Sequence, residues 1–569
     1  MKNLWNTLDA SKCEDELSLR VYSSRLLGQS SELVLHGGGN TSVKINQTNI
    51  FNEDEEILYV KGSGWDLVSI EKEGFSPVKM DMLLKLASLE KLSDTDMVKY
   101  QRQALIDPSA PNPSVEAILH AIIPFKYVDH THADAVVTVS NSKDGKKRLH
   151  EIYGTKVLFI PYIMPGFELA SKMNTMLQDI DLSHYEAIIL ENHGVFTYSD
   201  DAKKSYDKMI EIVTKAQDYM YINNAVICDE IIEEKSSGLF ASIGNFFANL
   251  FKSSQDDCSI DKPKEFSALE FATIRANISA LKNQPTLVKL DNSLKAYTFS
   301  NTEKVDNLYL GGVQTPEHIL RLKKEPAFIE NEEVVDEAFD KFISKYKQYF
   351  EFHEPEDGSI PMHNPAPNWA IYKDRGILCF GKNIKDTNII NDIAICNITS
   401  MLKAEKLGGY QSISSADMFN MEYWELELAK LGKSTPKEFE GKIVILAQED
   451  EAIKKVFEDN SAVVLTLKDD TQESIEEAIK TYGGVDIFIN NSDNDIDKLI
   501  PFLKLGINPK IIVINSNEDL ETTTKELNQK LSEDEISVNA IFKADDKDHA
   551  KLCLALASKD FDGVNGVVL

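Results

Sequence analysis

The sequence predicts an α/β protein of several domains. With 569 residues the chain is too long for one hydrophobic core, and a length of this size corresponds to roughly three domains. Apolar strand-like runs alternate with helical patterns over residues 33–222, and from Gly441 onward the alternation has the cadence of a parallel sheet. We therefore expect layered α/β domains at both ends of the chain.

The composition argues against nucleic acid as a partner. Lys and Arg total 61 while Asp and Glu total 92, so the formal net charge is −31. A chain this acidic does not suit a phosphate backbone, although a local basic pocket for one small phosphate stays open. The apolar share of 42% is ordinary for a soluble globular protein.

Cysteine usage and hydropathy indicate a reducing compartment. The six cysteines, at positions 13, 228, 258, 379, 396 and 553, show no Cys-x-x-Cys spacing. Neither a disulfide framework nor a thiolate zinc site is therefore indicated. The N-terminal segment lacks the apolar core of a signal peptide, and no apolar run approaches the roughly 18 residues of a membrane span. We expect a cytoplasmic protein without membrane contact.

The first domain is predicted to carry its elements in a regular order. Residues 33–60 form short strands around a glycine-rich turn, and a helix over residues 114–123 begins with Ser114 as N-cap. Three apolar strands and a long helix follow, over residues 128–142, 156–164, 186–199 and about 200–221.

Two histidines stand at the start of the first of these apolar strands. In the stretch VDHTHADAVV, His130 and His132 are one residue apart, so they point to the same face of the strand. His193, in ENHGV, stands at the end of a later strand just before a turn. Three imidazoles with one open position are the composition of a catalytic zinc site, whereas a His-x-His pair alone is also common in cores and on surfaces.

A glutamate precedes the histidine strand in the stretch NPSVEAILHAIIP. Glu116 lies among apolar residues, and we expect their burial to raise the pKa of its carboxyl. A carboxylate of this kind suits removal of a carbon-bound proton near neutral pH. The alternative is an ordinary exposed helical glutamate. His120, one turn later, is predicted to pack, or to support the site from behind.

Two glycine-rich turns offer backbone amides. HGGGNTSVK, residues 36–44, adds the polar side chains of Asn40, Thr41 and Ser42, and VKGSG, residues 60–64, forms a second turn. Turns of this kind cradle phosphates, although most such turns only reverse the chain. With Ser114 and with Lys61 as a counter-charge, they could surround one phosphomonoester.

The middle of the chain contains an apolar stripe and a possible repeat. Residues 229–265 hold an amphipathic helix that we expect to pack on protein, with membrane contact as the minor alternative, because only one lysine lies close by. HGVFTYSDDAKKSYD from His193 resembles RGILCFGKNIKDTN from Arg375. If HTHADAVV also matches QTPEHILR, a second copy spans about residues 266–435, with Gln314, Pro316 and Arg375 in place of the three histidines.

The motifs HGGGNTSVK, VKGSG, PSVEAILHA, VDHTHAD and ENHGVFT resemble the class II aldolase and adducin N-terminal family, in the family's order, over about residues 15–222. The resemblance implies a three-layer αβα domain that binds one Zn²⁺ per chain and acts on a sugar phosphate. It assigns zinc ligation to His130, His132 and His193, proton transfer to Glu116, and phosphate contact to Asn40, Ser63, Gly64 and Ser114. One departure is Val115, where many family members have a second serine before the glutamate.

The later segments resemble a subfamily in which such an aldolase is fused to a short-chain dehydrogenase. The family's glycine-rich turn is replaced by LAQEDEAIKK, no Tyr-x-x-x-Lys pair follows Asn491, and the stretch from Asn491 to Ile536 is expected to be too short for the catalytic strand and helix. We therefore expect a truncated Rossmann-like domain that does not use NAD. The predicted domains are residues 1–228 (aldolase), 229–265 (linker with the amphipathic helix), 266–437 (second α/β lobe) and 438–569 (degenerate dehydrogenase).

These observations lead to one functional hypothesis with several rivals. The resemblance implies a zinc-dependent lyase that cleaves a ketose 1-phosphate, such as rhamnulose 1-phosphate, to dihydroxyacetone phosphate and a short aldehyde. It also implies a homo-oligomer with sites between subunits. The alternatives are a sugar-phosphate 4-epimerase or a dehydratase with nearly the same zinc set, and a non-catalytic adducin-like scaffold. A dehydrogenase activity is the weakest alternative.

Overall fold

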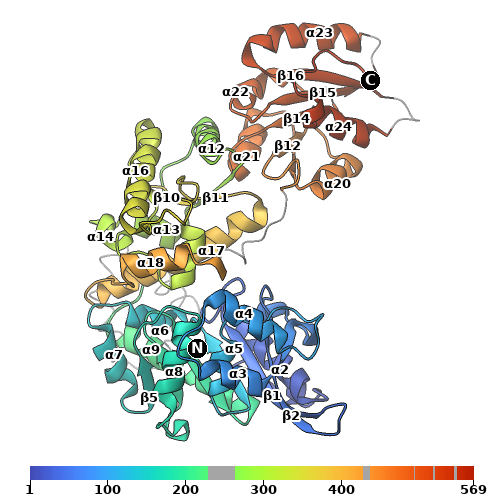
Figure 1. The fold of residues 1–569 in the computed structure, drawn as a ribbon. Helices are drawn as coiled ribbons and strands as arrows, with labels where there is room; N and C mark the ends of the chain where they lie inside the picture. The colour runs from blue at the N-terminus through green and yellow to red at the C-terminus, as the bar shows by residue number, and fades with distance from the viewer. Residues whose placement is uncertain (228–262, 427–435, 493, 517–518, 544–547) are drawn as a thin grey trace. The chain divides into compact units, whose positions relative to one another are not determined.

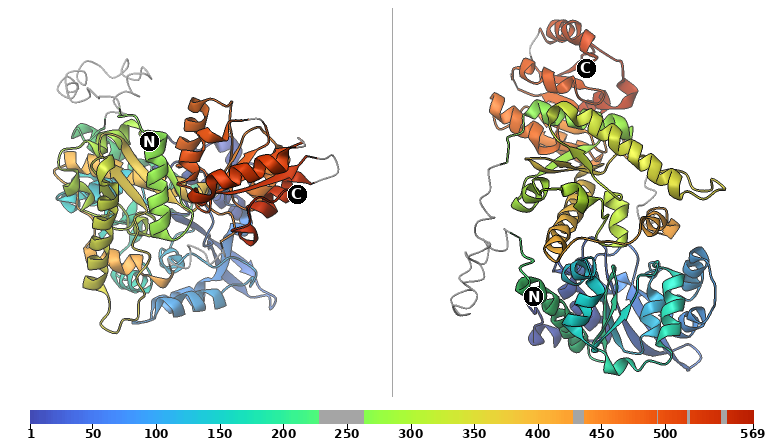
Figure 2. Two further views of the ribbon diagram at one scale, coloured as in Figure 1. Left: turned by 90° about the horizontal axis from the view of Figure 1, so that it is seen from above. Right: turned by 90° about the vertical axis from the view of Figure 1, so that its left-hand side faces the viewer.

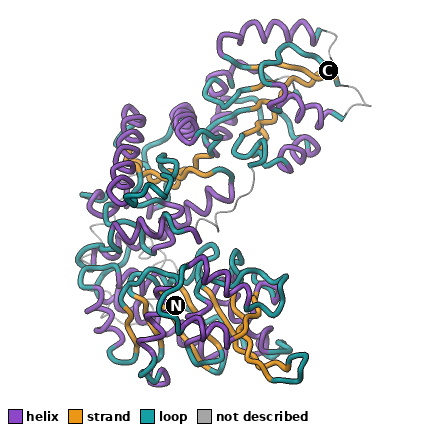
Figure 3. Tube along the Cα trace, in the orientation of Figure 1, coloured by secondary structure: helices purple, strands orange, loops and turns teal. Residues whose placement is uncertain are grey.

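The structure of the chain, a computed structural model, contains three β-sheets in the part that it describes (Figure 3). The described residues are 1–227, 263–426, 436–492, 494–516, 519–543 and 548–569, so nearly all of the predicted linker helix lies outside them. They form two compact units, of which the first comprises Met1–Gln255, Lys304–Glu325 and Ile395–Lys433 and the second Asp256–Glu303, Pro326–Ala394 and Ser434–Leu569.

The first unit is built on a seven-stranded sheet with the order β3-β2-β1-β4-β7-β6-β5. Neighbouring strands are antiparallel, except that β5 and β6 are parallel. The strands are β1 (Asn40–Thr48), β2 (Asp54–Lys61), β3 (Phe75–Lys79), β4 (Tyr127–Thr131), β5 (Val157–Ile160), β6 (Ala187–Leu190) and β7 (Gly194–Ser199).

Helices cover both faces of this sheet and make a three-layer αβα domain (Figure 1). Successive residues of a strand point to opposite faces, so Val195 and the next residue, Phe196, join different hydrophobic clusters. One face packs against α2 (Glu16–Gly28), α6 (Asp134–Ser140), α7 (Gly145–Tyr153) and α9 (Ala202–Ile222). The other packs against α3 (Met80–Ala87), α4 (Asp94–Gln103), α5 (Ala117–Ile122) and α8 (Phe167–Leu177). The predicted α/β class is confirmed.

The second unit contains a four-stranded sheet with the order β8-β11-β10-β9. Its strands are β8 (Leu287–Asp291), β9 (Ala327–Ile329), β10 (Trp369–Tyr372) and β11 (Gly376–Gly381), of which only β9 and β10 pair in parallel. The long helix α16 (Val335–His353) is the long yellow helix of this unit in Figure 2. It buries Phe339, Phe342 and Tyr346 in the core cluster of this sheet. Two further helices of this unit are α12 (Ala268–Lys282) and α13 (Leu294–Ser300). Helices α14 (Val305–Tyr309), α15 (Ile319–Leu322) and α18 (Ser415–Glu422) belong to the first unit, and α17 (Ile384–Lys406) is shared by the two units.

The four-stranded sheet has the same strand order and directions as β4-β7-β6-β5 of the first sheet. In this comparison Leu290 pairs with Leu378 as His130 pairs with Phe196. The counterparts of the three histidines are therefore Leu290, Asn292 and Arg375. The predicted match of the histidine strand to the residues from Gln314 onward is wrong, because those residues form the 3₁₀ turn η6 (Pro316–His318) and α15 rather than a strand.

The C-terminal region is a parallel five-stranded sheet with the order β13-β12-β14-β15-β16, as the cadence of the sequence predicts. The predicted lack of room after Asn491 is wrong, because short connections let both a strand, β15, and a helix, α23, fit before Ile536. Helices α21, α22 and α23 pack on one face and α20 and α24 on the other. The elements are β12 (Ile443–Leu446), α20 (Glu451–Asp459), β13 (Val463–Thr466), α21 (Gln472–Tyr482), β14 (Ile487–Asn490), α22 (Ile500–Leu503), β15 (Lys510–Asn515), α23 (Leu520–Leu531), β16 (Ser537–Phe542) and α24 (His549–Ala557).

Within the described residues, none of the helices combines the length and the apolar character needed to cross a bilayer.

Candidate metal and proton-transfer site

Strands β4 and β7 bring the three predicted histidines together. His130 lies in β4, His132 follows the end of that strand, and His193 precedes β7. One ring nitrogen from each lies within 4.8 Å of the other two, and Nε2 of His130 is 3.1 Å from Nε2 of His132. The three side chains are therefore close enough to share one metal ion.

The orientation of His130 is fixed by its surroundings. Its Nδ1 donates to the backbone oxygen of Val195 at 3.1 Å, and its ring stacks on Phe196 with centroids 4.2 Å apart. Nε2 is thereby left to face the other two histidines. Burial lowers the pKa of His130 to about 3, so the imidazole is neutral, which is the form that binds metals.

Glu116, the residue just before α5, directs its carboxyl group toward the same point. Its Oε2 lies 3.5 Å from Nε2 of His130, and its Oε1 lies 3.6 Å from Nε2 of His193. The side chain is 7% exposed, and Oε1 has no hydrogen-bond partner among the described residues. The carboxylate thus offers one oxygen to whatever the histidines bind.

The expected rise in the pKa of Glu116 is wrong. Burial does raise the pKa, but the attraction of His130 and His193 in their protonated forms and a hydrogen bond from Asn40 outweigh burial, and the pKa falls to about 2. The polar neighbours come from β1, from β4 and from the turn before β7, and the local apolar sequence around Glu116 does not reveal them. The carboxyl is ionised at neutral pH.

A chain of hydrogen bonds supports Glu116 from behind. Asn40 Nδ2 donates to Glu116 Oε2 at 2.5 Å, and Asn40 Oδ1 contacts Nε2 of His120. Ser42 Oγ lies 2.8 Å from Nδ1 of His120. Burial lowers the pKa of His120 well below its usual value, so the ring is neutral and donates from one nitrogen only. His120 therefore supports the site rather than merely packing.

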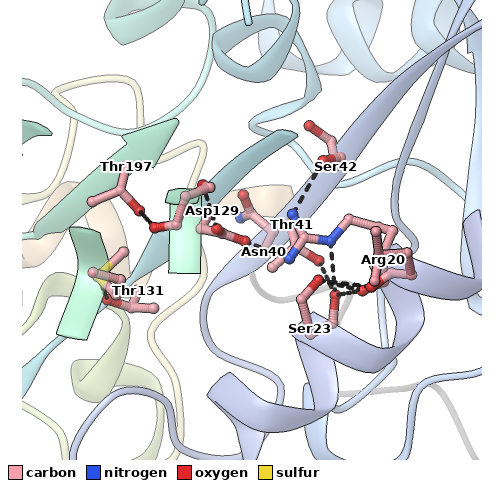
Figure 4. Close-up of polar contacts among 12 residues, drawn as sticks. Arg20, Ser23, Asn40, Thr41, Ser42, Asp129, Thr131 and Thr197 are labelled. Atoms are coloured by element: carbon pink, nitrogen blue, oxygen red, sulfur yellow. Dashed lines mark hydrogen bonds and ion pairs between the residues drawn. The ribbon is translucent and has the colours of Figure 1, made fainter. Parts of the chain in front are cut away.

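A buried ion pair fixes the two strands that carry these groups (Figure 4). Arg20 from α2 and Asp129 from β4 are fully buried, with Nη2 and Oδ1 2.5 Å apart. Arg20 also donates to the backbone oxygen of Ser42 at 3.3 Å, and Asp129 accepts from Ser205 at 2.5 Å. Because Asp129 and His130 are adjacent on a strand, a side chain held on one face orients the imidazole on the other.

The two glycine-rich turns and Ser114 meet beside the histidines. Lys61 Nζ donates to the backbone oxygen of Gly37 at 2.7 Å, and the backbone oxygen of Lys61 accepts from the amide of Ser114 at 3.1 Å. Gly39 has a φ of +61°, and a Cβ there would lie 2.8 Å from the backbone oxygen of His130. Only glycine allows this close approach.

The residues predicted to contact the phosphate differ in how many of their polar groups are already hydrogen-bonded within the protein. The amide group of Ser63 donates to the backbone oxygen of Asn112 at 2.8 Å, whereas Gly64 has open space around its Cα. The hydroxyl of Ser114 accepts from the amide of Glu116 at 3.3 Å. Asn40 uses both ends of its side-chain amide within the protein.

Glu317 is a residue of the site that the sequence did not reveal. Its Oε1 contacts Nδ1 of His132. It lies in η6, within the Lys304–Glu325 part of the first unit, far along the chain from the histidines. No sequence motif or periodicity connects Glu317 with the histidines. Glu317 reaches the site only because the fold brings its segment next to His132.

The C-terminal sheet has its topological switch point between β12 and β14, where a dinucleotide would bind in a complete Rossmann fold. Asn491 bridges the loops there, accepting from the amide of Gln448 at 2.8 Å and donating to its carbonyl at 2.9 Å. The N-terminus of α20 is capped by Asp450, which accepts from Ala452 and Ile453 at 3.0 Å each. A carboxylate thus occupies the helix end that a pyrophosphate would need.

Comparison with known proteins gives matches over most of the chain. The family described as "Class II Aldolase and Adducin N-terminal domain" matches residues 20–220, and "Aldolase class II, second domain" matches residues 265–431. A curated Bacillus subtilis (strain 168) protein, "Uncharacterized oxidoreductase YuxG", is 27% identical in an alignment of length 539. The match covers 86% of this chain and 74% of that protein.

Two solved structures also resemble part of the chain. The N-terminal class II aldolase domain of a conserved protein from Thermoplasma acidophilum is 37% identical, covering 39% of this chain and 99% of that one, with a TM-score of 0.36. The L-fuculose-1-phosphate aldolase from Thermus thermophilus is 17% identical, covering 36% and 94%, with a TM-score of 0.24.

Proposed function

We propose that this chain, which belongs to the class II aldolase and adducin family through residues 20–220, is a metal-dependent lyase for a ketose 1-phosphate such as rhamnulose 1-phosphate. The products would be dihydroxyacetone phosphate and a short aldehyde. The observation that carries the proposal is the convergence of three imidazoles and one buried carboxylate on a single point.

The donor set fits a zinc ion, one per chain. His130, His132 and His193 would hold it, since neutral imidazoles are preferred zinc ligands and a three-histidine set leaves a position open for substrate. The orphaned Oε1 of Glu116 also fits a nearby positive charge. When bound, the ion supplies a Lewis acid that polarises the oxygen atoms of the sugar.

Glu116 would transfer the proton at carbon C3 of the sugar. Cleavage of the C3–C4 bond takes a proton from the C4 hydroxyl as the aldehyde forms, and C3 must receive one. Oε2 of Glu116 is held by Asn40, whereas Oε1 points toward His193 and is available to carry that proton. A carboxylate held in one orientation is suited to general acid–base catalysis.

The phosphate would lie in the cradle formed by the two glycine-rich turns. We assign its contacts to Asn40, Ser63, Gly64 and Ser114, with the backbone of Asn40 serving because its side chain is engaged with Glu116 and His120. Gly64 offers open space, and Lys61 adds positive charge at the base of the cradle.

We further propose that the C-terminal sheet transfers no hydride, although a curated relative is named an oxidoreductase. The Asp450 cap and the Asn491 bridge support this, and so does the absence of tyrosine from α23. The chain would act in the cytoplasm as a homo-oligomer. Light scattering of the purified protein can measure the number of chains in the oligomer.

A substrate panel tests the proposed reaction. Zinc-loaded protein is incubated with ketose 1-phosphates of five and six carbons, and release of dihydroxyacetone phosphate is followed with a coupled reductase. Zinc-dependent cleavage of at least one substrate supports the lyase. Inversion at C4 without cleavage would contradict the lyase and indicate an epimerase. Loss of water without cleavage would indicate a dehydratase. No turnover of any substrate would favour a non-catalytic scaffold.

A further inference from the structure

The side chain of Glu317 contacts His132 on the side of the ring that faces away from the other histidines. Nε2 of His132 lies 3.1 Å from Nε2 of His130, while Nδ1 of the same ring pairs with Oε1 of Glu317. The pair is largely shielded from water, since the His132 and Glu317 side chains are 14% and 26% exposed. The two ring nitrogens of His132 therefore face two different partners.

The segment that carries Glu317 is fastened within the first unit by hydrogen bonds of Gly312 and Gln314, just before Glu317. The amide of Gln314 donates to Asn397 at 2.5 Å, and the carbonyl of Gln314 accepts from Asn141, the C-cap of α6, at 2.6 Å. The hydroxyl of Tyr410 donates to the carbonyl of Gly312 at 3.2 Å. Pro316 opens η6 and restricts its backbone further. Glu317 is thus presented from a fixed backbone.

An imidazole that binds a metal through one nitrogen commonly donates from the other to a carboxylate or a carbonyl, which fixes its tautomer and its orientation. His130 already has such a partner in the carbonyl of Val195. We infer that Glu317 is a positioning residue for His132, holding its Nε2 toward the proposed metal. The inference rests on the proposed function, and it assigns part of the metal site to a residue outside the first family match, residues 20–220.

The test uses the full-length protein, two variants at Glu317 and a matched control. Glu317→Ala removes the acceptor, whereas Glu317→Gln retains an oxygen that can accept from Nδ1 of His132. The matched control is Glu325→Gln in the same segment, because the Glu325 side chain is 15% exposed and its carboxylate pairs with the neighbouring Lys324 at 2.8 Å. Zinc affinity is measured by competition with a colorimetric chelator, and the visible spectrum of the Co²⁺-loaded protein reports the ligand geometry.

We expect zinc affinity about 10–100-fold weaker in Glu317→Ala, an intermediate value in Glu317→Gln, and the wild-type value in the control. The Co²⁺ spectrum should change in Glu317→Ala, while the unfolding temperature of the metal-free variants stays at the wild-type value. If Glu317→Ala fails to fold, Glu317→Leu takes its place. Wild-type zinc affinity and a wild-type Co²⁺ spectrum in both Glu317→Leu and Glu317→Gln would then decide against the inference.

The outcomes separate the inference from the proposed function. Wild-type affinity and spectrum in Glu317→Ala would overturn the inference and leave the lyase standing. A wild-type protein that takes up no zinc would overturn both, because His132 would then have no metal to face.

Discussion

Asn40 Nδ2 lies 2.5 Å from Oε2 of Glu116, and this hydrogen bond joins the first strand of the seven-stranded sheet to the residue ahead of α5. Because Asn40 also contacts His120, the carboxylate is held at one oxygen while the other remains available. In the proposed mechanism, the first residue of β1 would therefore serve proton transfer as well as the phosphate cradle.

Replacing Glu116 should remove proton transfer and spare the metal. In Glu116→Gln we expect kcat to fall by about 10²–10⁴, the usual contribution of a general acid–base group, because an amide cannot carry the proton. Zinc content should stay at the wild-type value, since the three imidazoles are untouched. A coupled cleavage assay beside elemental analysis measures both, and a variant that keeps its kcat would exclude Glu116 from the chemistry.

Replacing Asn40 should act on the same step through Glu116. Asn40→Ala leaves Oε2 of Glu116 and Nε2 of His120 without a partner, so kcat should fall by about 10-fold or more. His120→Gln, one link further back, should have a smaller effect. An unchanged kcat with a raised KM in Asn40→Ala would instead indicate that Asn40 serves substrate binding only.

Loss of the buried ion pair between Arg20 and Asp129 should lower the free energy of unfolding. Arg20→Met leaves the Asp129 carboxylate buried without its counter-charge, which should lower the free energy of unfolding by about 3–5 kcal/mol. Arg25→Met on the same helix is the control, because Arg25 is 37% exposed and its pairing with Glu71 should matter by about 1 kcal/mol or less. Urea unfolding followed by circular dichroism compares the two, and equal losses would contradict the account.

Asp134 makes the stability depend on pH. Burial is the main cause that raises the pKa of its carboxyl from 3.8 to about 7, against the hydrogen bonds from Cys396 and Gln314. The folded protein thus holds this proton more tightly than the unfolded chain, so stability should fall as the pH rises from about 4 to about 7 and then level off.

Asp134→Asn removes this titration. Above pH 7 the metal-free variant should be more stable than the wild type by about 1–3 kcal/mol, and near pH 4 the difference should vanish. Thermal unfolding at a series of pH values checks the prediction. A variant that is less stable at every pH would show that the carboxylate is satisfied in the folded protein.

The sequence predicted the three histidines and the start of the strand that carries His130 because both depend on local patterns. The expected strand over residues 128–142 is wrong beyond Thr131, since Asp134–Ser140 form the helix α6, whose apolar residues pack on the sheet. A His-x-His pair on a strand must share a face, and a histidine ahead of a turn lies at the end of its strand. The roles of Glu317 and of the hydrogen bonds through His120 depend on segments that are far apart in the sequence but close in the fold. Local sequence patterns do not reveal such contacts. The pKa of Glu116 was predicted in the wrong direction for the same reason, since its polar neighbours come from other strands.

The C-terminal sheet gives a second lesson of this kind. Its parallel cadence was readable from apolar runs, but the room needed for β15 and α23 was overestimated, because the connections between them are short. The duplicated strand order of β4-β7-β6-β5 and β8-β11-β10-β9 became visible only through strand pairing, where Leu290 stands at the place of His130.

Zinc content tests the central claim most directly. Elemental mass spectrometry is applied to the purified wild type, to His193→Ala, and to His184→Ala, whose side chain is 78% exposed and lies outside the site. The account predicts about one zinc per chain in the wild type and in His184→Ala, and little in His193→Ala. Absence of zinc from all three after loading, or equal zinc in all three, would contradict a metal site at His130, His132 and His193.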